Sequence, residues 1–148
     1  MDHATLQIDI KHYRDLTKDE LYAIMVLRDL VFVVGQKITA VPEVDGRDPE
    51  CEHAMLYDGE QLIGTARLFA GEDPVVVGRV AIHPERQRQG LGSVLMRAVQ
   101  EHLGARHAEL HAQAHLEEWY ASLGWERFGE PFDEAEIPHV MMRWVPTR

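Results

Sequence analysis

The stretch that decides the fold is VAIHPERQRQGLG, residues 80–92. It begins with the end of a valine-rich run, Val75–Ile82, continues through a turn at His83-Pro84, and finishes with glycines at the start of an amphipathic segment. Gly90 and Gly92 lack side chains, so backbone amides there can approach a ligand closely. The first amides of a helix have no partner within the helix and carry positive potential. The stretch therefore predicts a strand, a turn and a helix N-terminus that binds a pyrophosphate.

Two other phosphate-binding motifs do not fit this stretch. A P-loop requires a lysine followed by serine or threonine, and a dinucleotide fingerprint requires a third glycine. Neither occurs here. A glycine-containing helix start with no ligand is the remaining alternative, and the stretch taken alone leaves it open.

The sequence on both sides of this stretch predicts a mixed sheet. Upstream, Asp58-Gly59-Glu60 indicates a hairpin turn between strands at 54–57 and 61–69, and a third strand follows at 75–82. Downstream, the pattern predicts a helix over 90–103 ended by Gly104, followed by a strand, a short helix and two strands, at 108–114, 116–123, 125–128 and 140–145. A meander followed by alternating strands and helices favours an α/β (α+β) fold.

The N-terminal part has a clear helix and a long irregular segment. A strand is expected at 5–10, and the spacing of Thr17 and Glu20 predicts a capping box at the start of a helix that continues to about Val33. Periodicity is lost from Gly35 to His53, where turn residues accumulate. A segment of this length is usually functional or contains a short helix.

Composition limits the classes of function. With 148 residues, 45% of them hydrophobic, the chain is expected to form one domain over 1–148, to be soluble and to reside in the cytoplasm. The net charge of -10 opposes binding to nucleic acid, and no apolar run is long enough to span a membrane. One basic island, with four arginines against a single glutamate between residues 79 and 97, favours a small anion.

Separate blocks of the sequence resemble one family of enzymes. The GNAT superfamily of acetyl-CoA-dependent N-acetyltransferases has the pyrophosphate motif Gln/Arg-x-x-Gly-x-Gly/Ala, and residues 87–92 are QRQGLG. The block HLEEWYASLGW, residues 115–125, is similar to the family's second motif, and Tyr120 occupies its tyrosine position. Shorter stretches at 31–34, 43–48, 112–115 and 137–139 resemble the ElaA-like subgroup. Gly35 departs from that subgroup, which commonly has glutamate there, so no acid-base role is transferred to it.

The resemblance implies a GNAT-like mixed, mostly antiparallel central sheet flanked by helices, and acetyl-CoA as cosubstrate without a metal. In the family, the strand before the motif splays from its neighbour, and its backbone pairs with pantetheine. That implies cofactor-binding residues at Val80, Ala81 and Ile82 for pantetheine, and for the pyrophosphate at Gln87, Arg88, Gln89, Gly90, Leu91, Gly92 and Ser93. A backbone N–H near Val80 can also polarise the thioester carbonyl, where charge develops during attack.

The resemblance further implies direct attack by an amine in a ternary complex, with Tyr120 as the acid that protonates departing coenzyme A. The amine must also lose a proton. Seven side chains are candidates to accept it: Glu43, Asp45, Asp48, His53, His83, Glu85 and His139. Glu43 and His139 are preferred because both lie in segments predicted to be irregular, and binding residues concentrate in loops. Solvated surface charge is the alternative for each of them.

The spaced histidines and the single cysteine do not indicate further chemistry. His107, His111 and His115 would stack on a helix and suggest a metal site, but alternation with apolar residues favours a strand, so no metal is predicted. Cys51 lies between Glu50 and Glu52, which disfavour its thiolate.

The sequence leaves two kinds of function to compare. The preferred one is an N-acetyltransferase acting on a small-molecule or peptide amine, and the alternative is a non-catalytic acyl-CoA binding or sensing module. The acceptor stays open, and a homodimer is compatible with the sequence.

Overall fold

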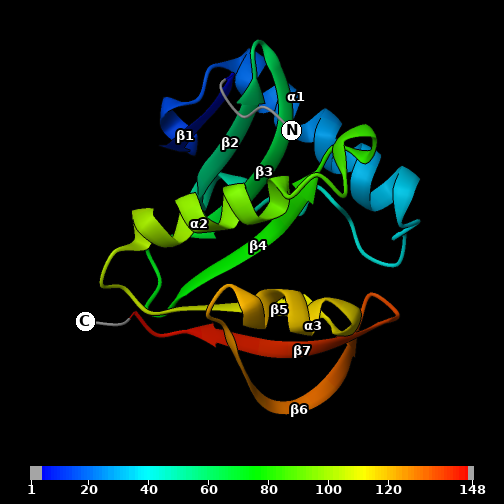
Figure 1. The fold of residues 1–148 in the computed structure, drawn as a ribbon. Helices are drawn as coiled ribbons and strands as arrows, with labels where there is room; N and C mark the ends of the chain where they lie inside the picture. Colours follow the sequence, from blue (N-terminus) through cyan, green and yellow to red (C-terminus); the bar gives the residue numbers. More distant parts are fainter. Residues whose placement is uncertain (1–4, 147–148) are drawn as a thin grey trace.

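In the computed structural model, which describes residues 5–146, seven strands form one sheet in the order β1-β2-β3-β4-β5-β7-β6 (Figure 1). Their bounds are β1 (Leu6–His12), β2 (Glu52–Asp58), β3 (Gln61–Phe69), β4 (Val75–Ile82), β5 (Ala108–Gln113), β6 (Glu126–Glu134) and β7 (Ile137–Trp144). All neighbours are antiparallel except β4 and β5, which are parallel. The predicted mixed, mostly antiparallel sheet is confirmed.

Three helices form where the sequence predicts them. Helix α1 (Lys18–Arg28) begins at a capping box in which the Thr17 hydroxyl accepts from the Glu20 amide, and it widens into the π-helical segment η2 (Asp29–Gly35). Helix α2 (Leu91–Leu103) lies between Gly90 and Gly104, both at positive φ. Helix α3 (Glu117–Ser122) follows β5. Single 3₁₀ turns precede or link these elements: η1 (Tyr13–Asp15), η3 (Asp48–Glu50), η4 (Pro84–Arg86) and η5 (Ala114–Leu116).

The helices cover both faces of the sheet, as alternation along β2 shows. Ala54 and Leu56 belong to the larger apolar core, beneath α2, whereas Met55 packs with the apolar side of α1 on the other face. Figure 1 shows α2 and α3 on the same side of the sheet. No helix among residues 5–146 is long and apolar enough to cross a membrane.

The last hairpin differs from the prediction. The strand expected at 125–128 is part of the longer β6, and β7 begins at Ile137, so His139 lies in a strand and the expectation of an irregular segment there is wrong. Gly129, at φ +73, accommodates a bulge between Phe128 and Phe132, after which the strand resumes its pairing with β7. A single glycine thus extends a strand that its local sequence seemed to end.

Candidate active site

The sheet opens between its two central strands. β4 pairs with β5 only through Val75–Val77, so the following residues up to Ile82 have no strand on that side. Arg79 sits at φ +51, beside an irregularity in the β3 pairing between Thr65 and Arg67, which bends β4 away. The splay that the family resemblance implies is therefore present, and it leaves backbone N–H and C=O groups of β4 free to pair with a ligand.

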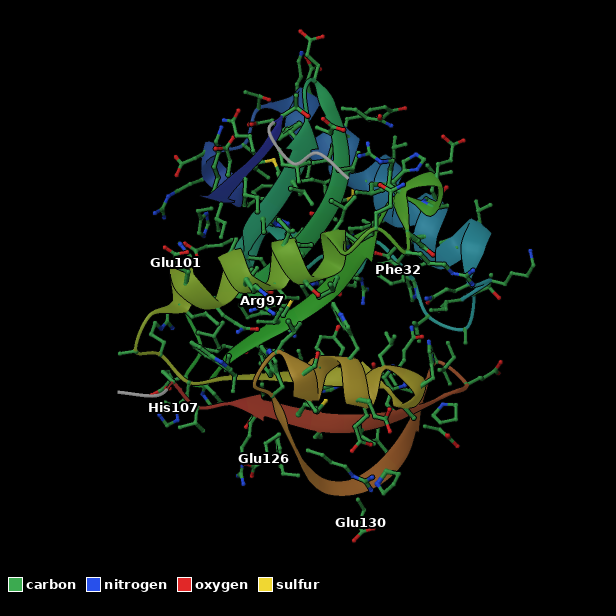
Figure 2. All side chains as sticks on the ribbon, in the orientation of Figure 1. Phe32, Arg97, Glu101, His107, Glu126 and Glu130 are labelled. Carbon is green, nitrogen blue, oxygen red and sulfur yellow. The ribbon has the colours of Figure 1, made fainter. Side chains whose placement is uncertain are left out.

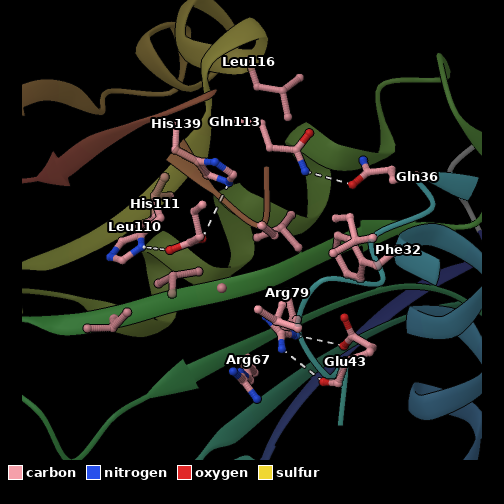
Figure 3. A pocket seen from close by; sticks show the side chains of 18 of the residues that line it. Phe32, Gln36, Glu43, Arg67, Arg79, Leu110, His111, Gln113, Leu116 and His139 are labelled. Carbon is pink, nitrogen blue, oxygen red and sulfur yellow. Dashed lines mark hydrogen bonds and ion pairs between the residues drawn. The ribbon is translucent and has the colours of Figure 1, made fainter. Parts of the chain in front are cut away.

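A cavity of about 470 Å³ occupies this opening. It brings together all three predicted catalytic residues, since Tyr120, Glu43 and His139 line it along with Val80 from β4. Figure 3 shows Glu43 and His139 on opposite walls of the cavity. Its apolar wall includes Phe32, Phe69, Leu110 and Leu116, and its other polar groups include Arg79, His111, Gln113 and Glu134. Ala81 and Ile82 do not line the cavity; Ala81 packs instead into the core beneath α1.

The predicted pyrophosphate residues form a tight turn at the end of β4. Arg88 and Gly90 both take positive φ. The side-chain amide of Gln87 donates a hydrogen bond to the carbonyl oxygen of Ile82 at 3.1 Å, which ties the turn to the strand. Gly90 is the N-cap of α2, and no side chain caps the helix. Among the described residues no atom lies within 4 Å of a Cβ placed on Gly90. The first amides of α2 therefore face open space beside the cavity-lining strand.

The structure gives different reasons for the other residues of the motif. A Cβ on Gly92 would lie 3.0 Å from the Trp119 ring, so a glycine there makes room for an indole. Ser93 accepts a hydrogen bond from the Trp119 ring nitrogen at 3.3 Å. Leu91 is buried in the core, and Gln89 accepts a hydrogen bond from Arg86. These residues can serve a phosphate mainly through backbone amides, while their side chains hold α2 and α3 together.

The basic island does not form one patch. Arg79 pairs with Glu43 at 2.8 Å, and Arg86 pairs with Asp58 at 2.9 Å. Arg97 is exposed on α2 (Figure 2). Only Arg88 lies at the turn itself, so the positive potential for a phosphate comes chiefly from the helix N-terminus.

Tyr120 is a buried phenol that faces the cavity. Its side chain is 6% exposed, and its ring packs edge-on against Trp119 with centroids 4.7 Å apart. Burial raises the pKa of Tyr120, so the hydroxyl stays protonated at neutral pH. Within residues 5–146 the structure gives this hydroxyl no hydrogen bond. A protonated donor is thus available to a ligand in the cavity.

The irregular segment before β2 is held by a cluster of buried ion pairs. Glu43 accepts from Arg28 at 2.7 Å and from Arg79 at 2.8 Å, and both arginines also bond its backbone carbonyl at 3.1 Å. The Asp48 carboxylate accepts a hydrogen bond from Arg28 at 2.6 Å. The whole cluster contains three arginines and three carboxylates: Arg28, Arg67, Arg79, Glu43, Asp45 and Asp48. Charge compensation therefore replaces regular hydrogen bonding in this segment.

The cluster predicts a loss of stability in acid. The Arg67 hydrogen bond outweighs partial burial and lowers the pKa of Asp45 below its ordinary value. In the unfolded chain this carboxylate takes up a proton near pH 4, while in the folded chain it stays ionised, so its contribution is complete above about pH 5 and is lost as pH falls. We expect Asp45→Asn to cost about 1–3 kcal/mol at pH 7 and about 1 kcal/mol less than that at pH 3, where only the unfolded chain has begun to take up the proton. Urea denaturation of both proteins from pH 7 to pH 3 measures this, and a constant difference would contradict it.

The remaining candidates for the base lie outside the cavity lining. Asp45 and Asp48 pair with arginines, and His53 is fully buried, with burial lowering its pKa. His83 and Glu85 belong to the turn η4, where the His83 ring accepts from the Glu85 amide at 3.1 Å. Of the seven candidates, only Glu43 and His139 reach the cavity.

His139 has a defined tautomer. Its Nδ1 lies 2.7 Å from the carbonyl oxygen of Ile137, which can only accept, so Nδ1 carries the proton and Nε2 has a free lone pair. The side chain is 7% exposed and lines the cavity. Nε2 of His139 is thus the ring atom that can accept a proton, in the place where an amine would have to lose one.

Several residues of the site were not predicted from the sequence. Arg28 and Arg67 lie at core positions of α1 and β3, and a charged residue in an apolar stripe was a usable signal for both. His111 was considered only as part of a metal site, and Glu134 was not considered. The predicted strand is confirmed, with Ala108, Leu110 and Ala112 buried and His111 exposed. Within residues 5–146 no group of three or more metal-binding side chains is found. Burial raises the pKa of the Cys51 thiol to about 11, which keeps it protonated.

Comparisons with known proteins agree with this geometry. Residues 36–146 match the family model described as an acetyltransferase (GNAT) domain. Protein ElaA of Escherichia coli is 34% identical over 140 residues, covering 88% of this chain and 91% of ElaA, and the ElaA crystal structure superposes with a TM-score of 0.85 over 94% and 99% of the two chains. An acyl-CoA N-acyltransferase from Pseudomonas aeruginosa is 38% identical, with a TM-score of 0.85 over 95% and 99%.

A more distant structure shares the fold. A GNAT family acetyltransferase from Elizabethkingia anophelis with acetyl-CoA bound is 13% identical, with a TM-score of 0.69 over 97% of this chain and 99% of that one. The splayed strands, the glycine turn before α2 and the matched sequences all point the same way, and the chain belongs to the GNAT acetyltransferase family, within its ElaA-like subgroup.

Proposed function

We propose that this protein is an acetyl-CoA-dependent N-acetyltransferase that transfers the acetyl group directly to an amine in a ternary complex. The observation that carries the proposal is that one cavity, at the splay of β4 and β5, is lined by both a buried phenol, Tyr120, and an imidazole, His139. The fold it shares with the acetyl-CoA-bound protein of Elizabethkingia anophelis supports the same cosubstrate here.

The chain offers one contact for each part of the cosubstrate. The open amides at the start of α2, from Gly90 to Ser93, would bind the pyrophosphate. Unpaired backbone groups of β4 near Val80 would bind pantetheine and polarise the thioester carbonyl. Ala81 and Ile82 would contribute through the same strand edge.

His139 is a better base than Glu43. The Glu43 carboxylate accepts from two guanidinium groups, and a proton placed on it would remove one of the three negative charges that balance the three arginines of the cluster. His139 holds its Nδ1 against the Ile137 carbonyl, so Nε2 is the atom that would receive the proton. We therefore assign proton removal to His139 and give Glu43 the part of holding the irregular segment against the sheet.

The proposed reaction couples the attack of the amine to proton transfers at His139 and Tyr120. The ammonium gives one proton to Nε2 of His139, and the amine attacks the thioester carbon. The C–N bond forms, the C–S bond breaks, and the sulfur takes the proton of the Tyr120 hydroxyl. The second proton on nitrogen restores that hydroxyl. Burial raises the pKa of Tyr120, which keeps the hydroxyl protonated until the thiolate departs.

The test is a thiol-release assay with acetyl-CoA and a panel of small amines, polyamines, peptide N-termini and lysine side chains. A melting shift with acetyl-CoA is measured beside it, and saturation at 100 times Kd should stabilise the fold by about 2.7 kcal/mol. We expect both a shift and turnover with at least one amine. A shift with no turnover across the panel would favour the sensing module, which has no need of an acid and a base facing one cavity.

A further inference from the structure

We propose that Glu134 binds the ammonium group of the acceptor amine beside His139, and that His111 holds Glu134 in position for it. The inference rests on the proposed function and names its substrate class, a primary alkylammonium. Glu134 ends β6 and lines the cavity between the two histidines. The carboxylate of Glu134 contacts both His111 and His139, and Figure 3 labels the two histidines.

The two faces of the carboxylate have different partners. Oε1 of Glu134 lies 2.7 Å from Nδ1 of His111, a hydrogen-bond distance that requires the histidine to donate. Oε2 lies 3.6 Å from Nε2 of His139, which is too long for a hydrogen bond. One oxygen is therefore satisfied and oriented, while the other faces the His139 ring without a hydrogen bond to it.

That second pair consists of two acceptors that converge. Nδ1 of His139 donates a hydrogen bond to the Ile137 carbonyl, so in the neutral ring Nε2 offers only a lone pair, and the facing oxygen belongs to a carboxylate. Two acceptors at this separation need a donor with at least two hydrogens, and a positive charge satisfies both best. A primary ammonium supplies both properties. It can donate to Oε2 and Nε2 together.

The charges of the cavity favour the same ligand. Glu43 is neutralised by Arg28 and Arg79, so it has little attraction left for a cation. Glu134 has only imidazole partners within the part of the chain that the structure describes. Glu134 is therefore the carboxylate in the cavity whose negative charge is not balanced by an arginine. It lies next to the residue that would take the substrate's proton.

The backbone around Glu134 is held in an unfavourable shape. The turn that follows places Ala135 at φ +51 and Glu136 at φ +65, a conformation that glycine or asparagine normally supplies. Strain of this kind persists where the surroundings require a particular geometry and tends to occur at functional sites. Phe132 adds a rigid support, because its ring lies edge-on to His111 and stacked on His139, with centroids 5.5 and 5.9 Å away.

The arrangement also serves the proton after it moves. When Nε2 of His139 accepts a proton from the bound ammonium, it becomes a donor that faces Oε2. The long contact in the resting site then becomes a hydrogen bond between an imidazolium and a carboxylate. Glu134 thus binds the substrate's charge first and stabilises the same charge on His139 afterwards.

The test uses n-butylammonium as the probe, titrated into the protein saturated with coenzyme A, with histidine ring nitrogens observed by NMR. We expect Nε2 of His139 to be unprotonated and to shift on titration. Glu134→Gln keeps the shape and removes the charge, so it should weaken the probe about tenfold. The matched control is Glu130→Gln, an exposed glutamate on the same strand and outside the cavity lining (Figure 2), which should leave the affinity within twofold.

The positioning part of His111 is tested by two variants. His111→Phe removes the donor and should weaken n-butylammonium several-fold, whereas His111→Asn retains an N–H and should restore the affinity. With an amine that the protein acetylates, Glu134→Gln should raise the KM for amine about tenfold and leave the KM for acetyl-CoA within twofold. A merely structural Glu134 would lower the melting temperature without separating the two KM values.

The outcomes separate this inference from the proposed function. Equal affinity of Glu134→Gln and the unmodified protein for n-butylammonium overturns the ammonium site, whatever the turnover. Proton density on Nε2 of His139 in the resting protein also overturns it. Absence of thiol release with every amine defeats the acetyltransferase proposal, and a tenfold loss of probe binding in Glu134→Gln would still establish the cation site.

Discussion

Tyr120→Phe is expected to lower turnover by about 10²- to 10⁴-fold while acetyl-CoA affinity stays nearly unchanged. The substitution removes only the hydroxyl, and the ring keeps its packing against Trp119 and Trp125. The proton for the sulfur would then have to come from water, which the buried position of Tyr120 disfavours. Steady-state turnover per folded molecule and calorimetric affinity for acetyl-CoA measure the two quantities separately.

A structural tyrosine would give the opposite pattern. If the hydroxyl only supported the fold, the melting temperature would drop and turnover per folded molecule would remain close to that of the unmodified protein. Turnover within about twofold of normal would rule out general-acid catalysis by Tyr120, since loss of a proton donor costs far more than that. Phe128→Leu, which changes a partly buried ring outside the cavity lining, serves as a control for aromatic substitution in general.

Gly90→Asp is expected to weaken coenzyme A binding about 100-fold. The space around Gly90 is open, so an aspartate side chain would project into the proposed phosphate site. At an effective dielectric constant of 20, two unit charges 4 Å apart repel by about 4 kcal/mol, and exposure of this turn to water and salt reduces that figure. Calorimetry with coenzyme A, together with a melting curve of the free protein, measures the effect.

Gly90→Asn is the matched control for shape. Asparagine has nearly the same size as aspartate and also tolerates the positive φ of this position, but it is neutral. We expect it to bind coenzyme A at least tenfold more tightly than Gly90→Asp does. Equal losses in the two variants would mean that bulk, not charge, decides binding, and an unchanged affinity in Gly90→Asp would remove the phosphate site. Gly92 is a poorer choice for this test because a side chain there would displace Trp119.

The parts of the fold that depend on local sequence were predictable. Alternation and turn residues predicted β3 and β4 with their observed bounds, and glycines marked both ends of α2. The sequence motif also located the turn between β4 and α2. These features depend on neighbours within a few residues, where propensity and capping decide the structure.

The arrangement of residues on the amine-acceptor side of the site was harder to predict from the sequence. Glu134, His111 and His139 come from three strands, and the strand order that joins them reverses the chain order of β6 and β7. The two-residue turn at Ala135 and Glu136 sets the register of the hairpin there, pairing Glu134 with Ile137 and Phe132 with His139, and this register places Glu134 beside the histidines. A pairing of this kind is tertiary information. The same is true of Glu43, whose role changes once two arginines from distant elements are seen to hold it.

The position of β7 between β5 and β6 has a consequence for how the protein folds. β5 precedes its antiparallel neighbour by about thirty residues of chain, so neither β5 nor β6 can complete its hydrogen bonding until β7 has been synthesised and inserted. The half of the sheet that contains β1 to β4 pairs in chain order and can assemble earlier on the ribosome. During synthesis, the turn before α2 that would bind the cosubstrate could therefore form before β5, β6 and β7 are paired. The two halves of the catalytic centre would then mature at different times.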